Sequence, residues 1–216
     1  MSGKPQVEIT GLEAKFYDFL LNMVLLGQYD PFIKKVIHHL RLNPDDIVMD
    51  LGAGTGKNAD LMLQYMNEHG KIYAIEIGEE MRKQLNHRQK SDSRIRVVHQ
   101  RIEEKFILPE LATVAFISFV MHGLEQPDRL KAIDNVYSNL SGLGRFCILD
   151  YNHFNVDHAP WYVKLAVRRL ECKPTESFIQ KDWQSLLQKK GFSEFTTVTY
   201  FRNYIRLLCC VKTVTE

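Results

Sequence analysis

Asp50-Leu51-Gly52-Ala53-Gly54-Thr55-Gly56 is the stretch that decides the fold of this chain of 216 residues. An apolar run, residues 47–49, precedes it, and residues 57–68 after it have the apolar spacing of a helix. Glycines are required at such a turn, because a Cβ would block both the tight bend and the approach of a ligand to backbone N–H groups. The stretch therefore predicts a strand, a ligand-binding loop and a helix in succession.

Strand-like and helix-like segments alternate on both sides of this loop. We expect helices at residues 13–26, 31–40, 57–68, 79–88, 127–140 and 181–190, with one helical turn near Glu103. The expected strands are residues 47–51, 71–77, 95–99, 114–120, 144–151, 194–201 and 204–212. Strands that alternate with helices predict a parallel sheet covered on both faces. Arg202 and Asn203 separate the last two strands, which are expected to form an antiparallel hairpin at one edge of the sheet.

The predicted fold class is therefore α/β, with a mostly parallel seven-stranded sheet, helices on both faces and a C-terminal antiparallel hairpin. The chain has no internal repeat, low-complexity tract or Gly/Ser-rich linker, which predicts a single domain over residues 1–216. Residues 152–177 are the least regular part of this domain.

The overall composition argues against two classes of partner. The net charge is only +2, from 28 Lys+Arg and 26 Asp+Glu, which gives no electrostatic case for a nucleic acid. The longest apolar run, residues 111–121, is too short to span a bilayer, because a spanning helix needs about 20 residues. We expect no stable membrane insertion.

The cysteines and the N-terminus predict a cytoplasmic protein. The first residues lack the apolar stretch of a secretory signal. The four cysteines show no metal-ligand spacing, and three lie in strand-like apolar contexts, so we expect buried thiols in a reducing compartment and no metal site: Cys147, Cys172, Cys209 and Cys210.

The spacing of the loop glycines separates three classes of ligand. A phosphate-binding Walker A loop would need Gly at position 51 and Ser or Thr at position 58, where this chain has Leu51 and Asn58. A dinucleotide fingerprint would need its third glycine at position 57, which is Lys57, so an NAD-dependent oxidoreductase is a less favoured alternative. Glycines spaced two and two suit a nucleoside ligand without a pyrophosphate.

Glu76 supplies a second element of the expected ligand site. It lies at the end of the second expected strand, residues 71–77, directly before Ile77. A carboxylate at the tip of that strand can accept hydrogen bonds from both hydroxyls of a ribose. The alternative is that Glu76 only caps the helix that begins near Glu79.

Taken motif by motif, residues 45–151 resemble the class I methyltransferases that use S-adenosylmethionine (SAM). Residues 48–56 are similar to the first motif of this family, which implies that Asp50 orients the loop and meets the amino group of SAM. The loop residues Gly52, Ala53, Gly54 and Gly56 would lie against the ligand, and Glu76 with the adjacent Ile77 would meet the ribose.

Three further motifs extend the resemblance. Residues 97–102 match the adenine-contact segment, which implies roles for Gln100, Arg101 and Ile102; Arg101 replaces a common Asp, and the amide oxygen of Gln100 could substitute for it. Residues 119–124 resemble the tip of the fourth strand, with Phe119 at the cofactor, and residues 140–146 resemble the turn before the fifth. The nearest subgroup contains the ubiquinone- and menaquinone-biosynthesis and small-molecule methyltransferases.

The resemblance implies an enzyme that moves a methyl group from SAM to a small-molecule acceptor and releases S-adenosylhomocysteine. A quinone- or lipid-type acceptor is one alternative, and a catalytically inactive SAM-binding accessory protein is another. Residues 1–44 would form a helical lid with Tyr17 over the cofactor, although the apolar helix at 13–26 fits a core or dimer surface equally well. Residues 152–177 would form an acceptor-side insertion that also suits peripheral membrane contact or a solvated face. A monomer and a homodimer both stay open.

Candidate catalytic residues follow the fourth and fifth strands. In open α/β sheets ligands bind beyond the carboxyl ends of the strands, which places His122, Tyr151 and His153 near the transferred methyl group. We hypothesise that one of them takes the acceptor's proton, where the acceptor must lose one. The alternative for either histidine is a hydrogen-bonded surface group.

Overall fold

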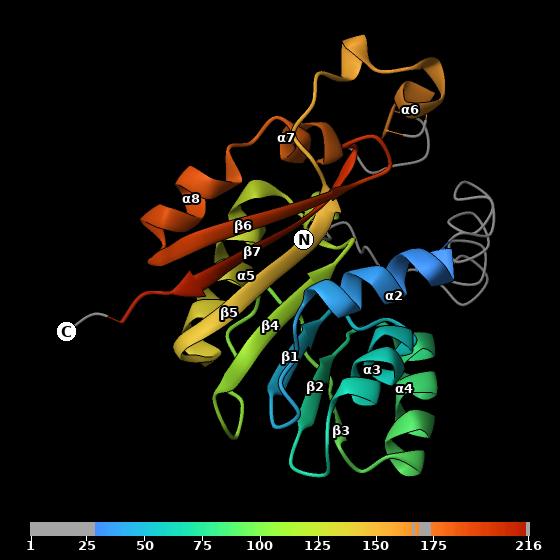
Figure 1. Cartoon of the computed structure of the whole chain (residues 1–216), viewed down its shortest axis with the longest axis vertical. Helices are drawn as coiled ribbons and strands as arrows, with labels where there is room; N and C mark the ends of the chain where they lie inside the picture. Colours follow the sequence, from blue (N-terminus) through green and yellow to red (C-terminus); the bar gives the residue numbers. More distant parts are fainter. Residues whose placement is uncertain (1–28, 166, 169–173, 215–216) are drawn as a thin grey trace, which may run out of the picture.

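The computed structural model describes residues 29–165, 167–168 and 174–214. Within them, seven strands form one sheet in the order β3-β2-β1-β4-β5-β7-β6 (Figure 1). The strands are β1 (Ile47–Leu51), β2 (Lys71–Ile75), β3 (Ile95–Val98), β4 (Ala112–Ser118), β5 (Leu140–Tyr151), β6 (Phe192–Tyr200) and β7 (Ile205–Lys212). Strands β1 to β5 are parallel to one another, whereas β7 runs antiparallel to both β5 and β6. The predicted sheet, with its antiparallel hairpin at one edge, is confirmed.

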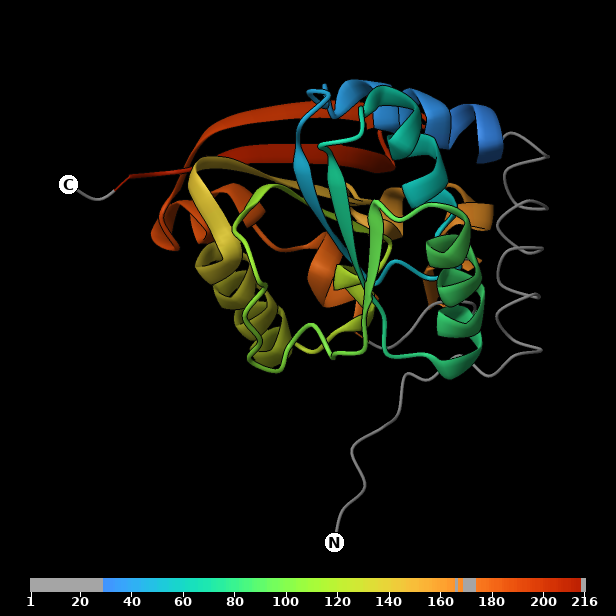
Figure 2. The ribbon, with the colours of Figure 1, turned by 90° about the horizontal axis from the view of Figure 1, so that it is seen from below.

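Helices cover both faces of the sheet (Figures 1 and 2). One face carries α2 (Tyr29–His39), α3 (Lys57–Met62) and α4 (Glu79–Ser91). The other carries α5 (Gln126–Asn139), α7 (Thr175–Ile179) and α8 (Trp183–Lys189). The remaining elements in the described part of the chain are α6 (Trp161–Leu165) and three short 3-10 helices, η1 (Leu63–Tyr65), η2 (Met121–Gly123) and η3 (Val156–His158).

Each face of the sheet has its own core because side chains alternate along the strands. Val48 and Phe116 pack under α2 and α3, and the neighbouring Met49 and Ile117 pack under α5 and α8. Strands buried on both sides are typically apolar without polar alternation, as residues 47–49 are, and these four side chains are at most 1% exposed.

Several predicted boundaries are wrong by a few residues. The helix expected at 57–68 ends at Met62 and continues only as η1, because the side chain of Asn67 accepts hydrogen bonds from the N–H groups of His69 and Gly70 and forms a turn. The helical turn expected near Glu103 is a simple turn, and Leu140, expected in a helix, already pairs with β4. The helix expected at 13–26 lies outside the described residues. None of the described helices combines the length and apolarity that crossing a membrane requires.

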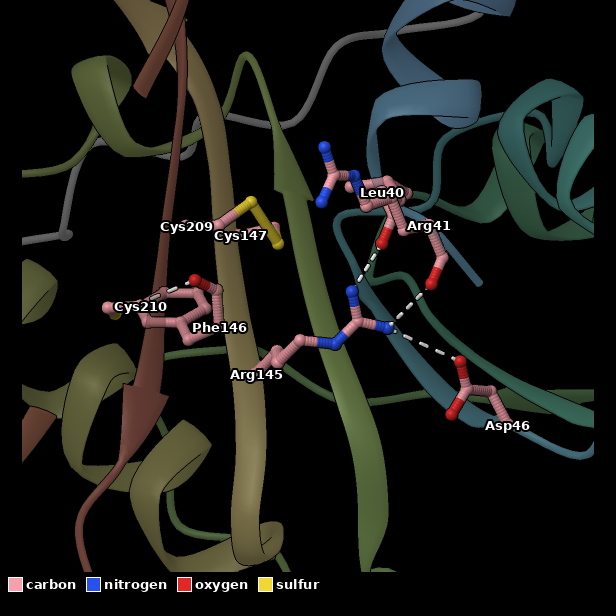
Figure 3. Close-up of a disulfide and its surroundings, with 8 residues drawn as sticks. All are labelled: Leu40, Arg41, Asp46, Arg145, Phe146, Cys147, Cys209 and Cys210. Atoms are coloured by element: carbon pink, nitrogen blue, oxygen red, sulfur yellow. Dashed lines mark hydrogen bonds and ion pairs between the residues drawn. A yellow bond between two sulfur atoms is a disulfide. The ribbon is translucent and has the colours of Figure 1, made fainter. Parts of the chain in front are cut away.

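Cys147 of β5 and Cys209 of β7 form a disulfide between these two neighbouring strands (Figure 3). The two residues are direct partners in the antiparallel register, with Cα atoms 4.1 Å apart. The prediction of buried thiols is therefore wrong for this pair, because a strand register that joins residues 62 positions apart leaves no spacing signal. It holds for Cys210, whose side chain is buried on the opposite face and whose thiol pKa is raised to about 12 by that burial. Cys172 lies outside the described residues.

We expect reduction of the Cys147–Cys209 disulfide to lower the free energy of unfolding by roughly 2–4 kcal/mol, because the bridge closes a long loop in the unfolded chain. Urea unfolding with and without dithiothreitol measures the difference. Cys209→Ser should unfold identically with and without reductant, whereas Cys210→Ser keeps the bridge and should stay sensitive to it. A wild-type curve that the reductant leaves unchanged would show that the bridge does not contribute.

Candidate functional site

The glycine loop joins β1 to α3 at the carboxyl edge of the sheet. The neighbouring strand fixes its backbone, because the N–H groups of Gly52 and Ala53 donate to the carbonyl oxygen of Ile75 at 2.9 and 3.0 Å. The loop lies where β1 adjoins both β2 and β4, the point at which the strand order reverses and where α/β sheets bind ligands. The predicted succession of strand, loop and helix is confirmed.

The glycines of the loop differ in which atoms a Cβ added at their position would contact. A Cβ at Gly56 would lie 2.6 Å from Cδ2 of Leu85, so this glycine is needed for packing against α4. Gly54 has a φ of +56°, and a Cβ built there would meet no heavy atom within 4 Å in the described part of the chain. Gly54 therefore borders open space, where a ligand has room to approach the backbone.

Glu76 directly follows β2 and binds the glycine loop. Its Oε2 accepts a hydrogen bond from the N–H of Gly54 at 2.9 Å, and its Oε1 accepts one from the N–H of Gly78 at 2.6 Å. Gly78 is the N-cap residue of α4, so the carboxylate serves the start of that helix as well as the loop. A carboxylate offers about four lone-pair positions, which leaves capacity for two ribose hydroxyls. Ile77, half-buried, lies next to it in the chain.

Asp50 is a buried carboxyl group beneath the loop, with only 1% of its surface exposed. Burial, and to a smaller extent the nearby charge of Glu76, raises its pKa from 3.8 to about 7. Its Oδ2 has no hydrogen-bond partner within the residues that the structure describes. A buried polar atom without a partner is costly, and a ligand that donates a hydrogen bond or carries a positive charge would remove that cost.

Residues 100–102 follow β3 at the same edge of the sheet. The guanidinium of Arg101 binds Glu103, and this hydrogen bond is the main cause of its raised pKa. A guanidinium cannot accept a hydrogen bond, so Arg101 cannot take over the acceptor role of the Asp that commonly occupies this position. Ile102 is buried, with its carbonyl oxygen accepting from Nδ2 of Asn135 at 2.8 Å. Gln100, partly exposed, is the residue of this segment with a side-chain acceptor.

Phe119 lies between β4 and η2 with a φ of +54°, a strained conformation for a residue other than glycine. Its N–H donates to the carbonyl oxygen of Leu149 at 2.9 Å, which holds the backbone in place. Its ring lies 6.4 Å from the ring of Phe32 of α2. The structure therefore places Phe119 between the sheet edge and α2, and Tyr17 lies outside the described residues.

His122 and Asp150 form a buried pair at the ends of β4 and β5. Nδ1 of His122 lies 2.8 Å from Oδ1 of Asp150, and the backbone N–H of His122 donates to Oδ2 at 3.1 Å. Since a carboxylate only accepts, Nδ1 carries the proton. The two side chains are 5% and 1% exposed, so water screens the pair little. The arrangement can hold an imidazole in one orientation and stabilise its protonated form.

The two other catalytic candidates, Tyr151 and His153, make different contacts. The ring of Tyr151 packs edge-on against the ring of His122, with centroids 5.3 Å apart. His153 is exposed, and its Nδ1 lies 3.0 Å from the carbonyl oxygen of Ile179. The structure thus brings His122 and Tyr151 together and leaves His153 exposed at the surface.

The sequence places Asp150 in the segment after the fifth strand, near the transferred methyl group, without giving it a role, and it does not single out Arg129. Asp150 occurs near the end of the apolar strand β5, as Asp50 does in β1, and this likeness was the available signal. Arg129 of α5 is 0% exposed and donates to the carbonyl oxygens of Met121 and His122. No feature of the sequence distinguishes it from a surface arginine. Within the described residues, no three His, Cys, Asp or Glu side chains are grouped so as to hold a metal ion.

Comparison with known proteins agrees with this architecture. Residues 48–144 match a family model described as a methyltransferase domain. No curated protein sequence matches the chain significantly.

Solved structures resemble the chain at low sequence identity. A SAM-dependent methyltransferase from Aquifex aeolicus is 20% identical, with a TM-score of 0.60 over 83% of this chain and 88% of that one. Human N-acetylserotonin methyltransferase, solved in complex with SAM, is 16% identical, with a TM-score of 0.67 over 90% of this chain and 55% of that one. The chain therefore spans about half of the human protein. The fold is the Rossmann-like fold of class I methyltransferases.

Proposed function

We propose that this protein is a methyltransferase that moves a methyl group from SAM to a small-molecule acceptor and releases S-adenosylhomocysteine. The observation that carries the proposal is the buried Oδ2 of Asp50, which has no partner among the described residues and lies beneath a loop where these residues leave open space at Gly54. The methyltransferase-domain match over residues 48–144 contains both positions.

The residues around the loop fit the three parts of SAM. Asp50 would receive the positively charged amino group of the methionine part, and Glu76 would accept from the ribose hydroxyls. Gln100 and Ile102 would contact the adenine. Bound SAM supplies a methyl group on a sulfonium, which activates it for displacement by an acceptor, so the protein must chiefly align the acceptor and exclude water.

His122 would act on the acceptor side. Its imidazole would take the proton of an acceptor that must lose one, such as a hydroxyl group. Asp150, 2.8 Å from Nδ1, would keep the ring oriented and would stabilise the imidazolium that forms. The proton therefore passes from the acceptor to His122 and later to solvent.

The nature of the acceptor follows only from the family resemblance. We retain a quinone- or lipid-type acceptor as the alternative substrate class, and an inactive SAM-binding accessory protein as the alternative without chemistry. A cytoplasmic location and a monomeric or homodimeric state stay predictions. The disulfide between Cys147 and Cys209 bears on the location, because structural disulfides persist mainly in oxidising compartments.

A thermal-shift titration with SAM, S-adenosylhomocysteine, NAD and ATP tests the cofactor. We expect only the two adenosyl-sulfur ligands to stabilise the protein, by about 2.7 kcal/mol at 100 times the dissociation constant. Gly54→Ala should abolish most of this shift, because its methyl group would enter the open space, at a cost in stability of about 1–2 kcal/mol for the left-handed backbone.

Gly142→Ala is the matched control, because a Cβ there meets Val214 at an ordinary 3.5 Å and no closer atom of the described residues, and Gly142 lies near the start of β5, far from the loop. This variant should bind SAM as the wild type does. A shift with NAD and none with SAM would refute the proposal, and equal binding by Gly54→Ala and the wild type would remove Gly54 from the site.

A further inference from the structure

Arg129 occupies the interior between α5, η2 and α7 and uses all of its hydrogen-bond donors. An arginine has five N–H groups, and the structure gives each an acceptor. Nε donates to the carbonyl oxygen of Met121, Nη2 to those of His122 and Pro174, and Nη1 to Oγ of Ser177 and Oε1 of Gln126, at 2.9, 3.1, 2.8, 3.1 and 3.3 Å respectively.

These bonds complete the restraint of His122. Asp150 holds the backbone N–H and Nδ1 of this residue, and Arg129 holds its carbonyl oxygen. Both backbone polar groups and one ring nitrogen are therefore fixed by buried charged side chains. A bond to a charged group is stronger than one between neutral groups, so this short turn is held more firmly than its three residues could hold themselves.

The same guanidinium reaches the acceptor-side segment expected at residues 152–177. Pro174 and Ser177 lie at the start of α7. Nη2 of Arg129 donates hydrogen bonds to the carbonyl oxygens of both Pro174 and His122. The rings of Phe178 and Trp183 lie 5.3 and 5.9 Å from the guanidinium carbon and keep water out. One side chain thus links the turn that carries His122 to the first residues of α7.

A purely structural role would not require a charge here. Burial of a guanidinium carries a large desolvation cost, and burial lowers the pKa of Arg129. Apolar residues of similar size often stabilise a core as well as a buried charge does. An apolar residue could not donate hydrogen bonds to the two carbonyl oxygens of η2 and, at the same time, to acceptors at the start of α7.

We propose that Arg129 is a positioning residue: it fixes the backbone of His122 and couples the placement of this histidine to α7. The proposal rests on the methyltransferase function only in the role that it gives to His122. The link from α7 through the guanidinium to the His122 turn restrains this turn in the ligand-free protein as well.

Arg129→Lys tests the restraint, because lysine keeps the charge but has only three donors. Proton NMR of the protein with S-adenosylhomocysteine follows the hydrogen exchange of the His122 backbone N–H and of its Nδ1–H. We expect both to exchange about 10- to 100-fold faster in the variant, because the turn opens locally more often. The affinity for S-adenosylhomocysteine, measured by calorimetry, should change less than about twofold, since Arg129 has no bond to the glycine loop.

Arg145→Lys is the matched control. Arg145 also binds two backbone carbonyl oxygens and a carboxylate, those of Leu40, Arg41 and Asp46, but at the other end of the sheet (Figure 3). This variant should lose stability without changing exchange at His122. Exchange that is equally fast in wild type and Arg129→Lys would overturn the proposal.

Ser177→Ala keeps the proposal testable if Arg129→Lys does not fold. It removes one acceptor on α7 and leaves the bonds of Arg129 to η2 in place. We expect exchange at His122 to rise several-fold, and no change would overturn the coupling to α7. A wild-type protein that binds neither SAM nor S-adenosylhomocysteine would refute the proposed function, but the exchange comparison in the free protein would still decide the role of Arg129.

Discussion

Asp50→Asn is expected to stabilise the ligand-free protein at pH 8 and to weaken SAM binding by about 10- to 100-fold. The loss of affinity follows from the loss of a charge-assisted hydrogen bond worth about 1.5–3 kcal/mol. The gain in stability follows because the buried carboxylate of Asp50 has no partner for Oδ2 among the described residues, whereas the amide carries no charge. Urea unfolding and calorimetry with SAM measure the two effects.

The pH dependence of the stability difference has a definite sign. Burial and Glu76 raise the pKa of Asp50 from 3.8 to about 7, so the folded state binds the proton more tightly than the unfolded state. The corresponding stability is fully present below pH 3.8 and is lost as the pH rises through 7. Asparagine does not titrate, so the advantage of the variant should grow from pH 4 to pH 8, to as much as about 4 kcal/mol.

Asp134→Asn is the control for this comparison. Asp134 is 56% exposed and pairs with Lys190 at the surface, where an ion pair contributes about 1 kcal/mol or less. Its replacement should leave both the pH dependence and SAM binding unchanged. If wild type and Asp50→Asn lose stability in parallel between pH 4 and pH 8, the carboxyl of Asp50 is not the group that titrates.

A carboxyl group that destabilises the free protein is understandable if it serves a ligand. Perturbed pKa values cluster at functional sites because such sites hold charges in low-dielectric surroundings until a ligand arrives. The same reasoning applies to Gly54, whose left-handed backbone suits glycine and keeps space open, at the entropic cost of ordering a glycine. The buried carboxyl of Asp50 and the glycine at position 54 both cost stability at the end of β1, and ligand binding explains both.

The sheet could be predicted because its signals are local. The run before Asp50 is apolar without alternation, and β1 begins and ends where the sequence placed it, at Ile47 and Leu51. The hairpin was visible from two β-rich runs around Arg202 and Asn203, and its turn residues have positive φ values of 55° and 70°. Strand ends and turns follow from a few neighbouring residues, which a single sequence displays.

The paired and buried groups could not be predicted because they depend on register. The bridge between Cys147 and Cys209 and the pair of His122 with Asp150 both join residues that only the strand order brings together. Arg129 is harder still, since its acceptors are backbone oxygens that any residue carries. The sequence placed His122 and Asp150 at the ends of the fourth and fifth strands and gave no sign that their side chains form a pair.

His122→Ala is expected to lower kcat by about 10²- to 10⁴-fold with an acceptor that must lose a proton, because general base catalysis contributes about that factor. The affinity for SAM should change little. Asp150→Asn should lower kcat in the same direction, since Asp150 orients Nδ1 of His122 at 2.8 Å. Steady-state kinetics with an acceptor found by screening hydroxylated and aromatic compounds measures both.

His153→Ala is the matched control, because His153 is exposed and contacts only the carbonyl oxygen of Ile179 in the described hydrogen bonds of its ring. It should retain nearly the wild-type kcat. A second control is an acceptor with no proton to lose, such as a tertiary amine, for which His122→Ala should cost far less. If His122→Ala turns over a hydroxyl acceptor as fast as the wild type, the buried pair is structural, and Tyr151 becomes the remaining candidate for the proton.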